Sequence, residues 1–297
     1  MCLADESVCI GKDGTNKENG DHIYEGEHFK AVFDGATPKG RRPWDGVPGD
    51  VFASRVLCEA MKNADPAFCS SDMITYLNDV IKKCYSESGV SFDELAPEER
   101  LQVSVIIYSR YRREVWSFGD CSVKINDKLY KHTRTGDKLL SDLRAFYTEL
   151  YLLKHRDIID EDPGRAAILP LLKEFPSMAN QDGEFGYDVI NGGDICTDHI
   201  VVYPVKPGDR IILASDGYPE LFDTLEETER YLFRMIEKDP LCIHELRGTK
   251  GVGLGKQSFD DRSWGQVPLN FYKIWWTEVI KSCWIIFSAR RCSCVCA

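Results

Sequence analysis

Residues 31–39 read Ala-Val-Phe-Asp-Gly-Ala-Thr-Pro-Lys, and in this stretch a short apolar run stops at Asp34. The run predicts the end of a buried strand, and Gly35 lets the backbone turn sharply beside the carboxylate. An ionised carboxylate in that position is costly unless a cation offsets its charge. The same arrangement recurs at 211–217, where Ile-Ile-Leu-Ala-Ser-Asp-Gly contains Asp216. Two such turns far apart in the sequence indicate two acids that converge on one site.

The composition of the chain limits its class. Its 297 residues suffice for a sizeable core. With 48 Asp and Glu against 37 Lys and Arg, the formal charge is −11, which argues against a nucleic-acid partner. The 12 cysteines are mostly scattered singly, so structural zinc is not expected. The N-terminus resembles no secretory signal and no apolar run reaches the roughly 18 residues that span a bilayer, so we expect a cytoplasmic protein.

Hydrophobic spacing predicts helices and antiparallel strands. We expect helices over 51–62, from 71 or 72 to about 84, and over 142–155, 164–175 and 225–238. We expect strands over 8–10, 28–33, 103–108, 113–118 and 123–130. Residues 199–205 and 210–214 are expected to pair as a hairpin, and Asp50 is expected to cap the first helix. Short turns between strands favour an antiparallel sheet over βαβ units.

Acidic residues recur at predicted strand ends and in tight loops: Asp21, Asp34, Asp120, Asp216, and the pair Asp260 and Asp261. Carboxylates are the hard oxygen ligands that Mg²⁺ and Mn²⁺ favour. Two such ions can hold a hydroxide between them and clamp a phosphoryl oxygen. Solvated loop carboxylates would give the same spacing, so the residues alone leave a metal site and plain turns as alternatives.

Taken in order, these positions resemble the motifs of metal-dependent protein phosphatases of the type 2C (PPM) family. The matching stretches are Glu18-Asn19-Gly20-Asp21, Phe33-Asp34-Gly35, Gly119-Asp120-Cys121-Ser122, Ala214-Ser215-Asp216-Gly217 and Ser258-Phe259-Asp260-Asp261-Arg262-Ser263. Each motif is short, and their shared order over about residues 8–264 carries the resemblance. The family's fold implies an α+β, four-layer α-β-β-α sandwich of two mostly antiparallel sheets flanked by helices.

The resemblance also implies metal ligands. Asp34 would bridge two Mg²⁺ or Mn²⁺ ions, with the carbonyl of Gly35 as a further ligand. Asp21 would contact one ion directly or through water. Asp216 and Asp260 would hold the other ion, so that Asp34, Asp216 and Asp260 would be the catalytic residues.

A third, looser ion is supported in some family members by acids that correspond to Asp120 and Glu220. The implied activity is hydrolysis of phosphoserine or phosphothreonine in a phosphorylated protein substrate, as used in signalling. A metal-activated hydroxide would attack phosphorus in line. This mechanism needs no phospho-enzyme, so we expect Cys121 to be a small core residue.

The sequence departs from the family pattern beside the first aspartate. Many members carry Asp-Gly-His-Gly, in which the histidine is proposed as a general acid, whereas Asp-Gly-Ala-Thr here places Ala36 at that position and resembles a bacterial-type branch. The proton donor is therefore unassigned, with His22 and a metal-bound water as candidates. An arginine that clamps the substrate phosphate in some members has no firm match, and Lys12 or Lys17 would substitute for it.

Two basic stretches allow more than one interpretation. Lys39, Arg41 and Arg42 would draw an anionic substrate to the rim of the site, or form a solvated basic loop. Residues 247–257 are basic and glycine-rich but lack the spacing of a phosphate-binding loop, so we expect a flexible connector.

The sequence predicts a division after residue 264. Residues 1–264 would form a type-2C-like catalytic domain, and residues 265–297 a tail of uncertain fold that is rich in aromatic residues and cysteine. The Trp-Gly-Gln-Val-Pro sequence at 264–268 breaks the pattern expected of a last strand. An interfacial amphipathic helix is one interpretation of the tail.

Three functions are compatible with the sequence. The first is a Mg²⁺- or Mn²⁺-dependent protein serine/threonine phosphatase. The second is a catalytically impaired pseudophosphatase that binds a partner as a scaffold. Ala36, the shortened acidic motif of the first loop and the unusual C-terminus favour it, and the retained Asp34, Asp216 and Asp260 disfavour it. The third is a small-molecule phosphomonoesterase, which would share the site and differ at its rim. The sequence does not determine the oligomeric state.

Overall fold

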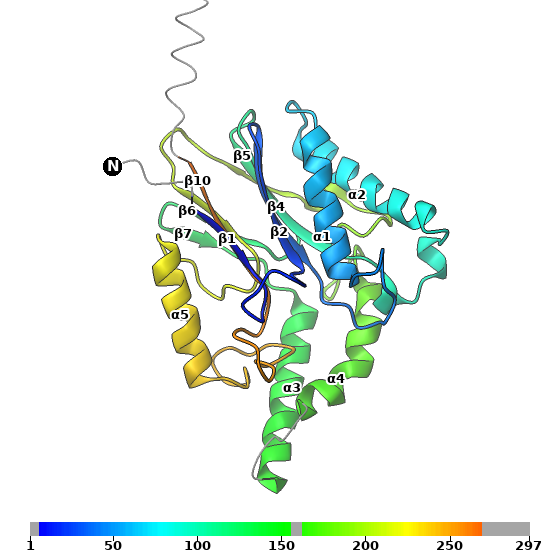
Figure 1. Cartoon of the computed structure of the whole chain (residues 1–297), viewed down its shortest axis with the longest axis vertical. Coiled ribbons are helices and arrows are strands. Elements are labelled where there is room, and N and C mark those ends of the chain that lie inside the picture. The colour runs from blue at the N-terminus through cyan, green and yellow to red at the C-terminus, as the bar shows by residue number, and fades with distance from the viewer. Residues whose placement is uncertain (1–5, 156–161, 269–297) are drawn as a thin grey trace, which may run out of the picture.

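Two five-stranded antiparallel sheets pack face to face in the structure, a computed structural model that describes residues 6–155 and 162–268 (Figure 1). The first sheet has the order β1 (Ser7–Ile10), β10 (Arg262–Val267), β9 (Ile211–Ala214), β6 (Ser122–Ile125) and β7 (Lys128–Tyr130). The second sheet has the order β2 (Asp21–Glu25), β3 (Phe29–Gly35), β4 (Val103–Ser109), β5 (Glu114–Phe118) and β8 (Val201–Pro204).

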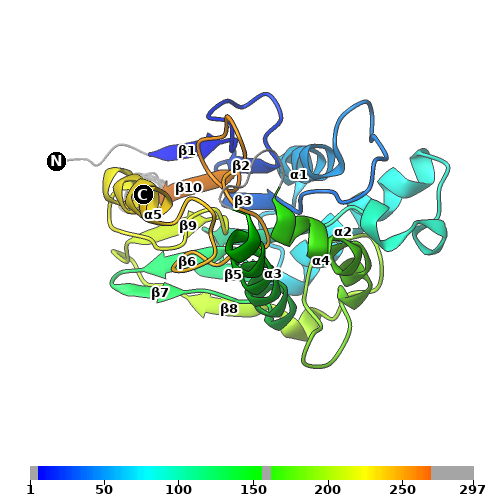
Figure 2. The same cartoon turned by 90° about the horizontal axis from the view of Figure 1, so that it is seen from below.

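Helices cover both outer faces of the sheets. On the second sheet lie α1 (Gly49–Ala60) and α2 (Ser70–Glu87), and on the first lies α5 (Leu225–Lys238). At one end of the sandwich, α3 (Thr135–Lys154) and α4 (Pro163–Glu174) pack against each other (Figure 2). Short 3-10 helices occupy Met61–Asn63, Phe92–Glu94, Pro97–Glu99, Phe175–Met178 and Thr197–His199. The predicted α+β, four-layer sandwich is confirmed.

Successive side chains of the central strand β3 enter two different apolar cores, one on each face of the sheet. In β3, Val32 faces the first sheet, where its cluster includes Leu213. The next residue, Phe33, points to the helical side and shares a cluster with Leu57 of α1 and Leu77 of α2. Because successive side chains of a strand point to opposite faces, one apolar run can serve both layers. This explains why the run before Asp34 is continuous rather than alternating.

Several element predictions need correction. The strand expected over 123–130 is a hairpin of β6 and β7, which turns at Asn126 with φ 54°. The hairpin expected from 199–205 and 210–214 is wrong, because β8 pairs with β5 in the second sheet while β9 lies between β10 and β6 in the first. Helix α3 begins at Thr135 rather than at residue 142.

The last strand is complete despite its unusual sequence. Residues 264–268 were expected to break the strand pattern, but β10 runs to Val267 and pairs with both β1 and β9. Pairing on both sides satisfies the backbone of this segment, which offsets its weak alternation. The division after residue 264 stays a prediction, and residues 269–297 lie outside the described residues. Over the described ranges, no helix combines the length and the apolar character needed to cross a membrane.

The core between α2 and the second sheet sets much of the stability. Leu77 is fully buried there. We expect Leu77→Ala to lower the free energy of unfolding by about 2–5 kcal/mol, because it removes buried methyl groups and leaves a cavity. Urea unfolding followed by circular dichroism would measure this change. Leu254→Ala, at a side chain that is 96% exposed, is the control and should change stability by less than about 0.5 kcal/mol.

Candidate functional site

The two strand-end aspartates meet where the sheets come together. Asp34 lies in β3 directly opposite Asp21 of β2. Asp216 follows β9 of the other sheet, and its backbone N–H donates to Asp34 Oδ2 at 3.3 Å. Each sheet therefore contributes one of the two turns that the sequence singled out, and the predicted convergence of Asp34 and Asp216 is observed.

Asp21 is fixed by a short chain of hydrogen bonds. Its side chain is buried, and its Oδ2 accepts a hydrogen bond from Ser215 Oγ at 2.6 Å. Ser215 Oγ in turn accepts from the backbone N–H of Ser263 in β10 at 2.8 Å. The serine before Asp216 thus connects the second sheet to two strands of the first, which holds the acids in register.

The grouped carboxylates destabilise one another's charged forms. Burial raises the pKa of Asp21 and Asp34 well above the usual range, and the negative charges of neighbouring acids add to the effect. Asp216 has an exposed side chain, yet its pKa is also raised, first by loss of surrounding water and then by repulsion from Asp34. Opposite charge placed among these groups would relieve the repulsion.

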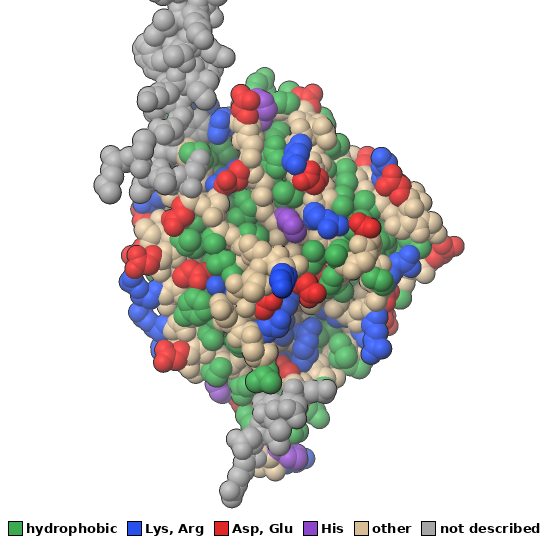
Figure 3. Space-filling model, in the orientation of Figure 1, with side chains coloured by type: hydrophobic (Ala, Val, Ile, Leu, Met, Phe, Trp, Pro, Cys, Tyr) green, Lys and Arg blue, Asp and Glu red, His purple; other side chains and the backbone are tan. Residues whose placement is uncertain are grey.

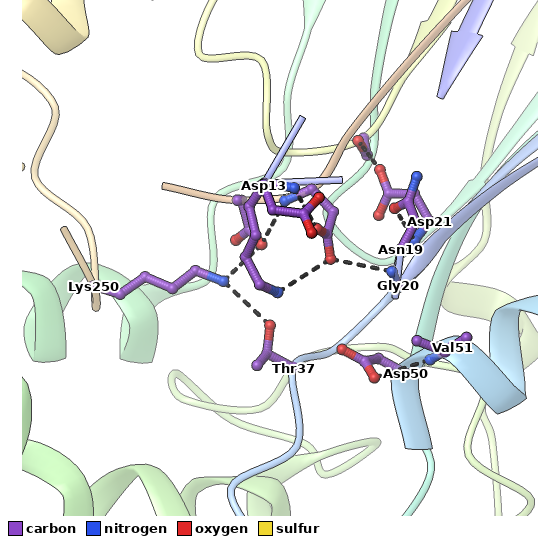
Figure 4. A network of polar contacts seen from close by, with 12 residues as sticks. Asp13, Asn19, Gly20, Asp21, Thr37, Asp50, Val51 and Lys250 are labelled. Atoms are coloured by element: carbon purple, nitrogen blue, oxygen red, sulfur yellow. Dashed lines mark hydrogen bonds and ion pairs between the residues drawn. The ribbon is translucent and has the colours of Figure 1, made fainter. Parts of the chain in front are cut away.

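A lysine from the 247–257 stretch reaches Asp260. The Asp260 Oδ1 atom accepts hydrogen bonds from Lys250 Nζ at 2.6 Å and from the backbone N–H of Asp261 at 3.0 Å. Burial acts to raise the pKa of Asp260, but Lys250, Lys12 and the Asp261 N–H together lower it, and the net shift of the pKa is downward. Lys250 also lies 3.2 Å from Thr37 Oγ1 (Figure 4). The 247–257 stretch, expected to be a flexible connector, therefore places the ammonium group of Lys250 beside Asp260.

Asp261 organises the loop between β1 and β2. Its Oδ1 accepts from the backbone N–H of Lys12 at 2.8 Å, and its Oδ2 accepts from Lys12 Nζ at 3.2 Å and from the N–H of Gly20 at 3.1 Å. Lys12, expected as a phosphate clamp, is therefore paired with a buried acid. Lys17, the other candidate, is exposed on the loop.

Gly35 is required by close backbone approach. Its N–H donates to Gly20 O at 3.1 Å. A Cβ atom at residue 35 would lie 2.6 Å from Asp50 O and 2.7 Å from Gly20 O. Asp50 was expected to cap α1, but Pro48 is the N-cap and the buried Asp50 lies in the first turn. Burial raises the pKa of Asp50. One feature of the sequence indicates that Asp50 lies beside the site: it is an acidic residue that follows Asp34 by a short distance in the chain.

Asp120 lies close to the acids, whereas Glu220 is oriented toward a different partner. Asp120 Oδ1 accepts from Ser104 Oγ at 2.6 Å and from Arg134 Nη2 at 2.9 Å, and its charge helps to raise the pKa of Asp34. Glu220 is not among the acids that shift the Asp34 pKa most, and its charge acts on Lys131. A third ion shared by Asp120 and Glu220 stays a prediction. Neither Ser104 nor Arg134 was singled out from the sequence.

The candidate proton donor is on the wrong face. His22 follows Asp21 in β2, so its side chain points away from the acids, and its Nδ1 lies 2.9 Å from Ser54 Oγ in α1. The expectation that His22 protonates a leaving group is therefore wrong. Ala36 offers no titratable group either. Cys121 is fully buried, as expected of a core residue.

Basic side chains gather beside Asp260. Lys39 Nζ donates to the carbonyl of Thr37 at 2.5 Å, so Thr37 binds one lysine through its carbonyl and Lys250 through its hydroxyl. Burial lowers the pKa of Lys39 to about 8, and the charges of Lys250 and Arg165 contribute. Lys and Arg side chains are also grouped near the middle of the face in Figure 3. Lys250 and Arg165, from two other segments, add positive charge near Lys39. The rim predicted from Lys39, Arg41 and Arg42 stays a prediction.

The described carboxylates of the site have the right chemistry for Mg²⁺ or Mn²⁺, but they do not converge into a complete set of ligands. Among the described residues, no three His, Cys, Asp or Glu side chains converge closely enough to form a complete metal-binding group. Mg²⁺ keeps several waters and needs only one or two carboxylates, so a loose set of acids is compatible with it. The oxygen-only chemistry and the mutual repulsion of Asp21, Asp34 and Asp216 favour a hard cation.

No protein-family model matches the sequence, and no curated protein matches it. Among solved structures, this chain is similar to the serine/threonine phosphatase PstP/Ppp of Mycobacterium tuberculosis, with 14% identity, 90% of this chain and 98% of that chain covered, and a TM-score of 0.47. It is also similar to the PPM Ser-Thr phosphatase MsPP of Mycobacterium smegmatis (15% identity; 91% and 99% covered; TM-score 0.42) and to the serine/threonine phosphatase Stp1 of Staphylococcus aureus (12%; 90% and 95%; 0.45). Similarity at this level does not establish a function for this chain.

Replacement of Gly35 tests the close approach. We expect Gly35→Ala to destabilise the fold by about 1–3 kcal/mol, because the new methyl group overlaps two backbone oxygens that cannot shift independently. Thermal unfolding of the variant would measure the loss. Gly46→Ala is not a clean control because Gly46 has φ 77°, so Gly253→Ala, whose Cβ would meet only the Lys256 side chain at 3.4 Å, serves instead and should be nearly neutral.

Removal of one repelling charge tests the electrostatics. The pKa of Asp34 is higher in the fold than in the unfolded chain, so the metal-free protein loses stability as pH rises above about 4 and until pH passes the folded pKa. In chelator, Asp34→Asn should therefore raise the melting temperature at pH 7, by about 2–4 °C for each kcal/mol of relieved repulsion. The gain should vanish near pH 4. Asp127→Asn, at a fully exposed side chain, is the charge-matched control.

Proposed function

We propose that this protein is a metal-dependent phosphatase that hydrolyses phosphoserine or phosphothreonine in proteins. The observation that carries the proposal is the meeting of Asp34 and Asp216, which come from the two sheets and both have raised pKa values. Asp21 and Asp260 extend this acidic group on either side. Carboxylates that repel one another in a solvent-accessible position are typical of a cation-binding site rather than of a structural core.

The same carboxylates would hold the ions. Asp21, Asp34, Asp216 and Asp260, together with the carbonyl of Gly35, would hold Mg²⁺ or Mn²⁺. When bound, such ions supply Lewis acidity that activates water and neutralises charge on phosphoryl oxygens.

The chain's own residues would position the phosphoryl group. Lys250, which binds Asp260, and Lys39, which binds Thr37, would provide positive charge that attracts a phosphate dianion. Lys250 and its neighbours hold the pKa of Asp260 below the usual range, so this carboxylate would be ionised at neutral pH. Arg134 and Ser104 bind one oxygen of Asp120, whose charge acts on Asp34. Since His22 points away and Ala36 cannot donate, the leaving alkoxide would take its proton from water.

A second candidate is a non-catalytic protein that binds a partner through the same fold. Ala36 favours it, and so does the lack of a complete metal-binding group in the described part of the chain. The repulsion among Asp21, Asp34 and Asp216 disfavours it, because a scaffold gains nothing from grouped acids. A phosphatase for small phosphorylated molecules would share the site, and only the rim would differ.

The proposed reaction is tested with a phosphoserine peptide and Mn²⁺. We expect turnover that a chelator abolishes, and we expect Asp34→Asn and Asp216→Asn each to lower kcat/KM by about a thousandfold or more, since several kcal/mol of charge stabilisation are lost. Asp127→Asn, at an exposed acid away from the site, should retain activity.

Calorimetric titration with Mn²⁺ separates the candidates. Binding that both Asp34→Asn and Asp216→Asn weaken supports the phosphatase. Activity that is insensitive to chelator and to both substitutions would contradict the metal mechanism. Absence of divalent binding at millimolar concentration would support the scaffold.

A further inference from the structure

Helix α3 exposes a continuous row of large apolar side chains. Its members, here called the α3 seam, are Leu139, Leu143, Phe146, Leu150 and Leu153, with exposed fractions of 57%, 41%, 59%, 41% and 82%. Single exposed leucines are ordinary, but a row of five on one helix indicates a surface that a partner covers. None of these residues belongs to the acidic site.

The seam has the spacing of a coiled coil. Successive members are separated by four, three, four and three residues, the alternation that places side chains on one stripe with a 3.5-residue repeat. Leu143 and Leu150 take the a positions, and Leu139, Phe146 and Leu153 take the d positions. A helix that only packs on its own domain needs no such stripe on its outer face.

The opposite face of α3 already binds the rest of the molecule. Its buried residues include Ser141, Arg144, Ala145 and Thr148, at positions b, c and f of the same heptad. Arg144 is nearly inaccessible and donates to Asp162 and to backbone carbonyls, including that of Cys242. The five seam side chains stay exposed while α3 packs on its own domain. Beside the seam, Glu149 Oε1 lies 3.7 Å from His244 Nδ1 of the same chain.

The charges beside the seam favour an identical helix in parallel orientation. Glu149 is at a g position and Lys154 at the following e position. In a parallel pair of α3 helices, Glu149 of each copy faces Lys154 of the other, which gives two attractive contacts. In an antiparallel pair, g positions face each other, so Asp142 of one copy would approach Glu149 of the other copy. Asp142 pairs with Lys138 and Arg247 of its own chain, and no attractive pair would form between the copies. The apolar side chains would supply affinity, and the charges would set direction.

The last described strand lies apart from most of α3. β10 ends at Val267 at the top of the molecule in Figure 1, whereas α3 extends from the middle to the bottom. Of the described segments, α4 contacts α3 most, and Leu140, at an e position of α3, packs with Ile168 and Leu172 of α4.

We propose that the α3 seam binds a second copy of this chain, and that the two α3 helices form a short parallel coiled coil about a two-fold axis. The seam covers 15 residues, about 22 Å of helix, or two heptads. So short a coiled coil forms a reversible dimer, aided by the support that each α3 receives from its own domain. The proposal does not depend on the proposed phosphatase activity.

Sedimentation of the full-length protein over a range of concentrations tests the dimer. The average mass should rise from that of one chain to that of two. The double substitution Leu143→Lys and Leu150→Lys should raise the dissociation constant by about a hundredfold or more, because it places four charges in the seam. Both residues are partly exposed, so the monomer should keep its far-UV spectrum and melting temperature. Leu254→Lys, at an exposed leucine outside the seam, should still dimerise.

Charge reversal tests the parallel direction. Glu149→Lys alone and Lys154→Glu alone should each raise the dissociation constant by about tenfold, and the combined Glu149→Lys, Lys154→Glu variant should restore it. A wild-type chain that stays monomeric at about 100 μM, a concentration at which even weak dimers form, would overturn the proposal. So would a dimer that survives the seam lysines. Failure of the double reversal to rescue would overturn the parallel arrangement.

Discussion

Repulsion among the carboxylates at the junction of the two sheets is the constraint around which this structure is built. Asp21, Asp34 and Asp216 have raised pKa values because the fold removes water and brings their charges together. Such a group opposes folding above its pKa and persists only if the surrounding sandwich holds it in place. The fully buried apolar residues on both sides of β3 provide that support.

The negative charges of the acids are offset to different degrees by hydrogen bonds and ion pairs. Acids with many partners hold the structure together, and acids with few partners form the candidate site. Lys12 and backbone N–H groups satisfy Asp261, which thereby ties the β1–β2 loop to β10. Ser215 supports Asp21 from one side only, and Asp34 receives a single long hydrogen bond from a backbone N–H. The acids with the fewest partners are those whose pKa values are raised most clearly. This pattern is what a cation-binding function predicts, since full internal compensation would leave nothing for an ion to relieve.

The N-terminal end of α3 adjoins the acidic site, and the α3 seam lies along the rest of the helix. Arg134, directly before α3, fixes Asp120 near the acids. The buried face of α3 anchors it to its own domain, so the helix is a rigid connection rather than a free arm. A partner bound at the seam would therefore contact the same helix whose N-terminal end adjoins the site.

The sequence by itself determined the local features. The strand-to-Asp-Gly turns identified Asp34 and Asp216, apolar spacing located four of the five α-helices within a few residues, and the resemblance to a family supplied the four-layer sandwich. Hydrogen bonding and side-chain alternation act over a few residues, so short windows of sequence report them reliably. The start of α3 was missed because residues 135–138 contain a glycine and no large apolar side chain, so helical spacing is not evident there.

Only the tertiary structure decided which distant segments meet. It assigned β8 and β9 to different sheets, turned His22 away from the acids, and brought Lys250 to Asp260. It also placed Arg134 on Asp120 and the first turn of α1 against Gly35. These contacts depend on strand order and on the packing of elements far apart in the chain, and their energies come from burial and charge in three dimensions. No spacing along the sequence encodes them.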